Sequence, residues 1–468
     1  MDSNSPIRRP SGRALILSLL LLPALQAAAA AASVPGFTFV KSLGGIDEYS
    51  LDSNGLQVLI KPDHSAPVVT FNVVYRVGSR NEVTGTTGST HLLEHLMFKG
   101  SDAYNDAKGN SVKQYLEKVG GNYNATTSLD RTNYYATVGS TALEGFMAIE
   151  ADRMRNLWLH DADKKSEMTV VRNEYERGKN DPNNFLMEEV TAAAYQASPY
   201  HHATIGWRSD IENVDTEKLR AFYDTFYWPN NATAILVGDV ETPVALAMIK
   251  NYYGKYPKSA KAIPQVYTEE PEQTGPRRVT VKMPGQLGTV IVAHKVPNGR
   301  DADTAALAVL DSILSDGKNS RLYKALVDTG IATDAGSFGG GNYDLSLHML
   351  AVGLAPDATH DRAEKTLLAE VERVKKDGVT AEEVASAIRR YRVQLAFDRD
   401  GTSAVAGTLN EYVAIGDWTL YVTMEDSIAR VKPVDVQRVA RKYLNEDQST
   451  TGWYIPVVPV TSGNKTAT

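Results

Sequence analysis

The stretch His91–Gly100, HLLEHLMFKG, is the most informative part of this 468-residue sequence. A buried strand is predicted before it at Val68–Val77 (VVTFNVVYRV), because β-branched and aromatic residues dominate that run. The loop Gly85–Thr90 is rich in glycine, threonine and serine and leads into a helix, for which Ser89 and Thr90 are candidate N-caps. The sequence therefore predicts a strand, a loop and a helix that contains the HLLEH pattern.

Two histidines of this helix are four residues apart and therefore share one face. His91 and His95 can reach one metal ion from that face, and Glu94 stays close to it. A catalytic zinc site takes three protein ligands and leaves its fourth position to water, so a carboxylate must come from elsewhere. Glu167 and Glu174 are the best candidates, because seven residues make nearly two helical turns and place both on one face of a later helix.

These residues predict a hydrolytic zinc site. We expect one Zn²⁺ per chain, held by His91, His95 and Glu174. Glu94 is the predicted general base, which takes a proton from the metal's water so that the hydroxide attacks a peptide carbonyl. Glu167 would orient a ligand histidine through a hydrogen bond.

A chance match is the main alternative for the five-residue pattern taken alone. In a chain with nine histidines it arises by accident in on the order of one chain in a hundred. The other seven histidines show no helical ligand spacing, and the adjacent pair among them is interpreted as part of a loop: His64, His160, His201, His202, His294, His348 and His360.

The first 32 residues have the order of a secretory signal peptide. Arg8, Arg9 and Arg13 form a basic start, Ala14–Leu25 is an apolar run, and Ala27–Ala32 offers Ala-x-Ala cleavage sites. The run is shorter than the roughly 20 apolar residues that cross a bilayer. We therefore expect an exported protein, with the periplasm as its destination and no stable membrane anchor.

Net charge and cysteine content exclude several classes of partner and of chemistry. The formal net charge is −7, and it becomes −9 without residues 1–32, which carry three arginines and one aspartate. An acidic protein has no bulk attraction for nucleic acid, so no nucleic-acid partner is expected. The chain has no cysteine, which excludes disulfides, iron–sulfur clusters and thiol catalysis.

The chain is long enough for two domains. Residues 258–278 contain three prolines and little apolar periodicity, so we interpret them as an interdomain linker. After the signal peptide (1–32), the predicted domains are a zinc-binding N-terminal domain at 33–257 and a C-terminal domain of an inactive type at 279–468.

Helix and strand patterns alternate in both halves. Asp215 is followed by Tyr223 eight residues later, and Asp435 by Tyr443 in the same way, and each pair precedes a predicted strand. This repeat predicts two similar α+β halves. A turn is predicted at Asn54–Gly55, with strands at 133–138, 232–237, 289–296 and 345–352 and helices at 110–119, 141–156, 164–179, 216–227, 302–314, 362–376 and 381–395.

Several segments resemble the pitrilysin, insulin-degrading-enzyme and mitochondrial-processing-peptidase family of zinc metallopeptidases, the inverzincins. HLLEHLMFKG is similar to the family's metal helix, and EMTVVRNEYER (Glu167–Arg177) to the segment with the third ligand. GGNYNATTSLDRTNYY (Gly120–Tyr135) is similar to the segment that lines the substrate strand. FYWPNNATAILVGDV (Phe226–Val240) and KNSRLYKALVDTGIA (Lys318–Ala332) extend the resemblance to nearly all of the chain after residue 32.

The resemblance implies an α+β fold of two similar domains that the linker joins. Each domain would have an antiparallel or mixed sheet covered by helices. It also implies an endopeptidase that cuts peptides or unfolded segments, with Asn124 and Ala125 in contact with the substrate strand. Four such domains enclose a chamber in the family, so a two-domain chain implies that two chains pair.

One departure from the family pattern bears on which kind of partner subunit this chain needs. Family members with a self-sufficient second half carry an Arg and, seven residues later, a Tyr that help hold the substrate carbonyl. The positions near Val327 and Asp334 hold neither. We therefore expect a heterodimer in which this chain carries zinc and a homologous metal-free subunit supplies Arg and Tyr, in preference to a homodimer. The alternative is a non-enzymatic structural or binding subunit of the family.

Overall fold

The computed structural model describes residues 34–457. The predicted signal peptide, residues 1–32, lies outside this range. Among the helices of residues 34–457, none combines the length and apolar character needed to cross a membrane.

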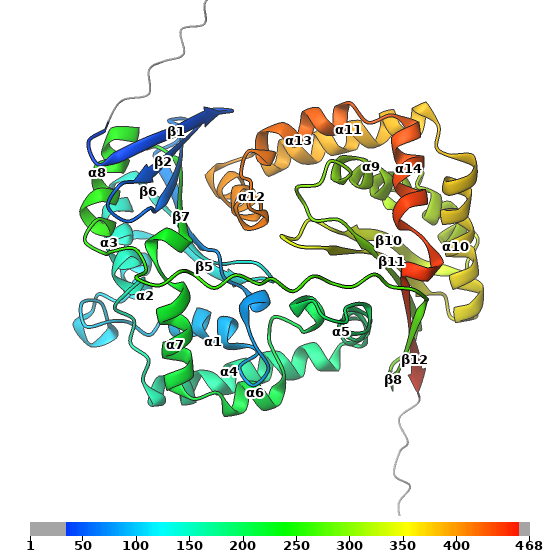
Figure 1. Ribbon diagram of the computed structural model, residues 1–468, viewed down its shortest axis with the longest axis horizontal. Coiled ribbons are helices and arrows are strands. Elements are labelled where there is room, and N and C mark those ends of the chain that lie inside the picture. The colour runs from blue at the N-terminus through cyan, green and yellow to red at the C-terminus, as the bar shows by residue number, and fades with distance from the viewer. Residues whose placement is uncertain (1–33, 458–468) are drawn as a thin grey trace, which may run out of the picture.

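The first half of the chain builds a seven-stranded sheet with the spatial order β1-β2-β3-β7-β4-β6-β5 (Figure 1). The predicted turn at Asn54–Gly55 joins two antiparallel strands of this sheet, and Gly55 takes a φ of 76° there. β5 forms one edge of the sheet. The strands are β1 (Phe37–Leu43), β2 (Ile46–Leu51), β3 (Gln57–Pro62), β4 (Val68–Tyr75), β5 (Asn122–Thr127), β6 (Thr132–Gly139) and β7 (Ala232–Gly238).

Helices of the first half cover one face of this sheet and bury its apolar side chains, Phe71 and Val73 of β4 among them. The longest is α4, which overlaps the helix predicted at 164–179. The helices are α1 (Ser89–Leu96), α2 (Val112–Val119), α3 (Leu143–Arg153), α4 (Asp161–Asn180), α5 (Pro182–Ala194), α6 (Arg208–Asn213), α7 (Thr216–Phe226) and α8 (Thr242–Tyr253).

The second half builds a five-stranded sheet with the order β10-β11-β9-β12-β8. Its strands are β8 (Arg277–Pro284), β9 (Thr289–Val296), β10 (Ala332–Gly339), β11 (Ser346–Leu354) and β12 (Ser449–Val457). Its helices are α9 (Thr304–Ser315), α10 (His360–Asp377), α11 (Ala381–Asp398), α12 (Thr402–Ile415), α13 (Leu420–Ala429) and α14 (Pro433–Tyr443).

The two sheets share one topology. In the first, β7 is parallel to β3 and antiparallel to β4. In the second, β12 is parallel to β8 and antiparallel to β9. The helices that begin near Asp215 and Asp435 precede β7 and β12 respectively. The predicted fold of two similar α+β halves is therefore confirmed.

Each half also covers the other half's sheet with one helix. α5 places Leu186 and Val190 against β8, β9 and β12, and α12 places Val405 and Leu409 against the first sheet. Gly452 of β12 permits this approach, since a Cβ there would lie 2.2 Å from Cγ2 of Val190. Burial of each of these aliphatic side chains contributes about 1.5–3 kcal/mol. The two halves therefore interlock.

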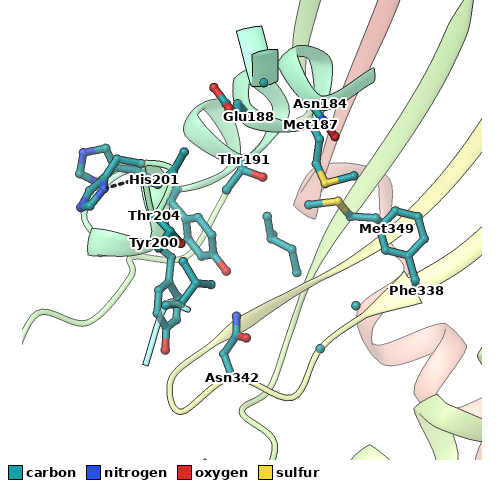
Figure 2. A pocket seen from close by; sticks show the side chains of 18 residues that line it. Asn184, Met187, Glu188, Thr191, Tyr200, His201, Thr204, Phe338, Asn342 and Met349 are labelled. Atoms are coloured by element: carbon teal, nitrogen blue, oxygen red, sulfur yellow. Dashed lines mark hydrogen bonds between the residues drawn. The ribbon is translucent and has the colours of Figure 1, made fainter. Parts of the chain in front are cut away.

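A cavity of about 410 Å³ lies at this junction (Figure 2). One wall is formed by α5 and the turn that follows it, and the other by β10, β11 and the loop between them. Residues from both halves of the chain are therefore needed to form the cavity.

Residues 254–276 run between α8 and β8 without helix or strand and cross the molecule (Figure 1). Glu270 fixes this segment, because its carboxylate accepts the backbone N–H groups of Gln196, Ala197 and Ser198 at 2.8–2.9 Å. It also pairs with the buried ammonium of Lys295 at 2.6 Å. Burial alone would raise the pKa of Glu270, but these donors outweigh it and lower the pKa to about 2.

We predict that Glu270→Gln lowers the free energy of unfolding by roughly 3 kcal/mol at pH 7, because buried Lys295 loses its charged partner. Since the folded pKa lies below the ordinary value, the stabilisation is present above about pH 4.5 and is lost as the pH falls toward 2. Urea unfolding between pH 7 and pH 3 measures the difference, with exposed Glu269→Gln as the control. A pH-independent difference would contradict this assignment.

Candidate metal centre

The metal-site helix α1 begins at Ser89, after Gly88 in the left-handed conformation with a φ of 85°. The predicted side-chain caps, Ser89 and Thr90, are wrong, since neither caps the helix. The buried carboxylate of Glu82 instead accepts the N–H groups of Gly88 and Thr90 at 2.8 and 2.7 Å. A carboxylate at this end of a helix is also favoured by the helix dipole.

The apolar side of α1 fixes which way its polar side faces. Leu92, Leu93 and Leu96 are buried in the core of the first half. His91 and His95 leave the helix on the other side, toward α4. The i and i+4 spacing thus has the predicted effect of turning both imidazoles toward one point.

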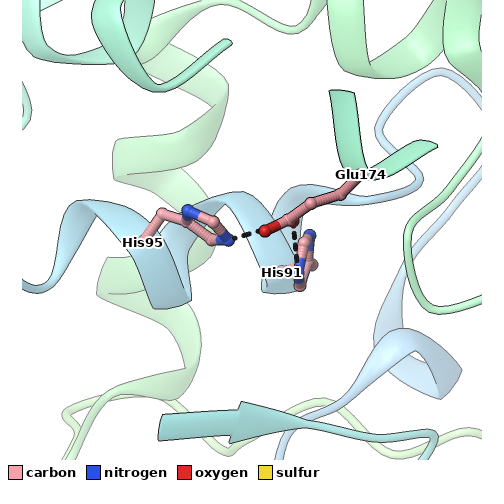
Figure 3. Close-up of side chains that lie close together, drawn as sticks. All are labelled: His91, His95 and Glu174. Atoms are coloured by element: carbon pink, nitrogen blue, oxygen red, sulfur yellow. Dashed lines mark ion pairs between the residues drawn. The ribbon is translucent and has the colours of Figure 1, made fainter. Parts of the chain in front are cut away.

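The structure brings His91, His95 and Glu174 together (Figure 3). Nε2 of His91 lies 3.6 Å from Oε2 of Glu174, and Nε2 of His95 lies 3.5 Å from the same oxygen. Two ligands bound at about 2.0–2.1 Å to a tetrahedral zinc ion lie roughly 3.3 Å apart. The donor atoms and their spacing therefore fit a zinc ion.

The protonation of His91 suits a metal ligand. Burial, followed by the neighbouring His95, lowers the pKa of His91 to about 4. The imidazole is therefore neutral at pH 7, which is the form that binds metal ions.

Glu167 is outside the cluster of His91, His95 and Glu174, but it contacts His95. Its Oε2 is 3.1 Å from Nδ1 of His95, and its other oxygen pairs with Lys99. Burial alone would raise the pKa of Glu167, but Lys99 and His95 outweigh it and the pKa is lowered. An ionised carboxylate on Nδ1 holds the His95 ring with Nε2 toward Glu174.

Glu94 lies beside the three clustered side chains. Its carboxylate accepts a hydrogen bond from the hydroxyl of Thr127, on β5. Burial raises the pKa of Glu94 above its ordinary value, although the Thr127 hydrogen bond opposes the shift. A raised pKa makes a carboxylate a better proton acceptor near neutral pH.

The predicted substrate contacts lie on the edge strand. Asn124 is exposed and Ala125 is buried, and both pair with β6 on the inner side of β5. The other side of β5 carries no strand within residues 34–457. Val327 and Asp334 lie in the second half, where Val327 is half-buried and Asp334 is exposed on β10.

Three residues of the site were missing from the sequence analysis. Thr127 follows Ala125 by two residues, so strand periodicity places both on one face of the strand. This periodicity could have identified Thr127 as a site residue. Lys99 lies within the HLLEHLMFKG stretch, but no spacing rule connects it with Glu167. Glu82 reaches α1 across a loop, and no local pattern predicts that contact.

Two protein-family models match the chain. The model described as Insulinase (Peptidase family M16) matches residues 57–207, and that described as Peptidase M16 inactive domain matches residues 213–391. The zinc protease PqqE of Helicobacter pylori is 31% identical over 408 residues, which cover 86% of this chain and 91% of the relative. The chain therefore belongs to peptidase family M16, the insulinase family.

Further comparisons agree with the predicted family and fold. A solved structure of a protease from Helicobacter pylori matches with a TM-score of 0.84 at 31% identity, over 88% of this chain and 100% of that one. The first half of the periplasmic protease PqqL from Escherichia coli gives a TM-score of 0.73 at 18% identity, over 90% and 94%. A probable mitochondrial-processing peptidase subunit beta from Arabidopsis thaliana is 24% identical over 425 residues, 88% of this chain and 79% of the relative.

We predict that Glu167→Gln weakens zinc binding about 10- to 100-fold, because the hydrogen-bond partner of a metal-binding histidine contributes that much to affinity. Competition with a chromophoric chelator measures the zinc dissociation constant. Glu176→Gln is the matched control on α4, since Glu176 is only partly buried and pairs with Arg208 instead. Equal affinities of the two variants would show that Glu167 does not support the site.

Proposed function

We propose that this chain is a zinc-dependent endopeptidase that hydrolyses peptides or unfolded segments. The observation that carries the proposal is the convergence of His91, His95 and Glu174 with Glu94 beside them, next to the open edge of β5. When bound there, zinc supplies the Lewis acidity that acidifies a water molecule and polarises a peptide carbonyl.

The roles of the chain's own residues follow from their positions. His91, His95 and Glu174 would hold the ion, and Glu167 would keep the His95 ring in place. Glu94 would accept the proton of the attacking water and pass it to the leaving amine. Its carboxylate is already held by a hydrogen bond from β5.

An extended peptide that adds to β5 as a further strand would run past Asn124 and Ala125 toward Thr127. Main-chain hydrogen bonds to the open edge would hold any sequence, and they suit an enzyme that binds unfolded segments. Because Thr127 bonds to Glu94, such a peptide would pass beside the general base.

We also propose that this chain is the zinc subunit of a heterodimer. The second half carries no Arg and Tyr at the positions near Val327 and Asp334. A homologous metal-free subunit would supply them. The similarity to a processing-peptidase subunit beta, a protein named as one subunit of a larger enzyme, supports this arrangement.

Export to the periplasm is part of the proposal. It rests on the order of residues 1–32 and on the likeness to PqqL, which is named as periplasmic. The alternative of a non-enzymatic subunit is less favoured, because all four metal-site and base residues are present and lie together.

We predict that, with a metal-free homologue present, Glu94→Gln lowers kcat at least 100-fold on a quenched fluorescent peptide library while zinc is still bound. Glu176→Gln should keep full activity. Metal analysis of each protein separates loss of zinc from loss of the base. An unchanged rate in Glu94→Gln would remove Glu94 from the proposed mechanism.

The same purified protein tests whether the chain needs a partner subunit for activity. Light scattering gives the mass of the isolated chain, and we expect zinc binding with little turnover until a metal-free homologue is added. A purified homodimer with full activity would contradict the heterodimer and leave the zinc site assignment standing.

A further inference from the structure

The cavity at the junction of the two halves has a lining suited to an apolar group. Met187 of α5 and Met349 of β11 point toward one another across it (Figure 2). Leu129 and Leu347 add aliphatic surface, and Phe338 adds an aromatic ring. With a volume of about 410 Å³, the cavity falls in the range of sites that hold small organic groups.

Several polar groups in the wall are engaged with other protein atoms, whereas the buried Nε2 of His202 has no hydrogen-bond partner within the described residues. Glu188 forms an ion pair with Lys179. Nδ1 of His201 lies 2.9 Å from the carbonyl oxygen of Ser198. A charged ligand would lose its hydration in this cavity and find few free partners, which is costly.

Two residues of the cavity wall lie close along the chain to residues of the candidate metal centre. Gly178, in its wall, follows Glu174 by four residues on α4 and therefore lies one helical turn along the same face. Leu129 follows Thr127 by two residues, just beyond the end of β5. A peptide that lies along β5 and passes Glu94 would therefore reach the cavity next.

The loop that carries Leu129 is held by residues from both halves of the chain. Asp130 accepts a hydrogen bond from the hydroxyl of Tyr200 and another from the N–H of Tyr343 at 3.0 Å. Arg80 pairs with Asp344 in the same network. The wall of the cavity is thus formed before any ligand binds, and a ligand does not have to order it.

We propose that this cavity is a specificity pocket for a large apolar side chain, aromatic or unbranched aliphatic, of the peptide that lies along β5. The proposal rests on the proposed peptidase function and names its side-chain preference. Edge-strand pairing binds the backbone without regard to sequence, so selectivity must come from a pocket that receives a side chain. Two methionines give this pocket a polarizable surface that adapts to side chains of different shape.

The first test is photo-crosslinking to the full chain, loaded with zinc and carrying Glu94→Gln so that peptides are bound and not cut. Peptides with p-benzoylphenylalanine at successive positions are irradiated, and mass spectrometry locates the crosslinks. We expect one position to label Met187 and Met349, and an excess of the same peptide with Phe to compete at least tenfold better than one with Lys. Crosslinks elsewhere only would overturn the pocket.

The second test changes the pocket itself. Thr191→Phe on α5 would fill part of the cavity, so affinity for the Phe peptide should fall at least tenfold while affinity for the Ala peptide changes less than threefold. Thr366→Phe on α10 places the same ring outside the cavity and serves as the control. Met187→Lys is a second variant, and it should shift the preference toward an acidic side chain. Unchanged preferences in both variants would overturn the proposal.

The outcomes separate the pocket from the proposed function. If the wild-type chain binds or cuts peptides but no apolar preference maps to Met187 and Met349, the pocket fails and the peptidase assignment stands. If the chain neither binds nor cuts any peptide, alone or with a metal-free homologue, the peptidase function fails and the pocket assignment fails with it.

Discussion

The approach of α4 to α1 is the contact on which the site depends. It brings two carboxylates, Glu167 and Glu174, against two partly buried imidazoles, His91 and His95. Charges in such a setting are costly unless they are paired or bound to a cation. Lys99 satisfies one of the carboxylates, and a metal ion would satisfy the other. A bound cation would therefore stabilise this acidic cluster.

The position of α4 depends in turn on distant parts of the chain. α4 leads directly into α5, and α5 is packed on the sheet of the second half. Glu270 in the linker holds the turn after α5 through three backbone N–H groups. The second half thus carries none of the predicted metal ligands but fixes the helix that supplies Glu174.

Local patterns predicted the parts of the fold that local physics decides. The i and i+4 rule gave the common face of His91 and His95, and the Asn54–Gly55 turn and the strand at Thr289–Val296 followed from residue type. The cap of α1 was wrong because Glu82 approaches across a loop. The exchange of α5 and α12 between the sheets could not be predicted, since an apolar helix face does not identify the surface it will cover. The similarity of the two halves extends to one side-chain contact near the site. In the first half, Glu94 of α1 accepts a hydrogen bond from Thr127 of β5, and in the second half Asp311 of α9 accepts one from Ser337 of β10.

The exchange of helices has a consequence for how the chain is made. The face of the first sheet that carries Leu59, Val74 and Ile235 is covered by α12, whose residues follow them by more than 160 positions. During synthesis this apolar surface stays uncovered until almost the whole chain has emerged. This delay makes the growing chain dependent on factors that shield apolar surface from other nascent proteins.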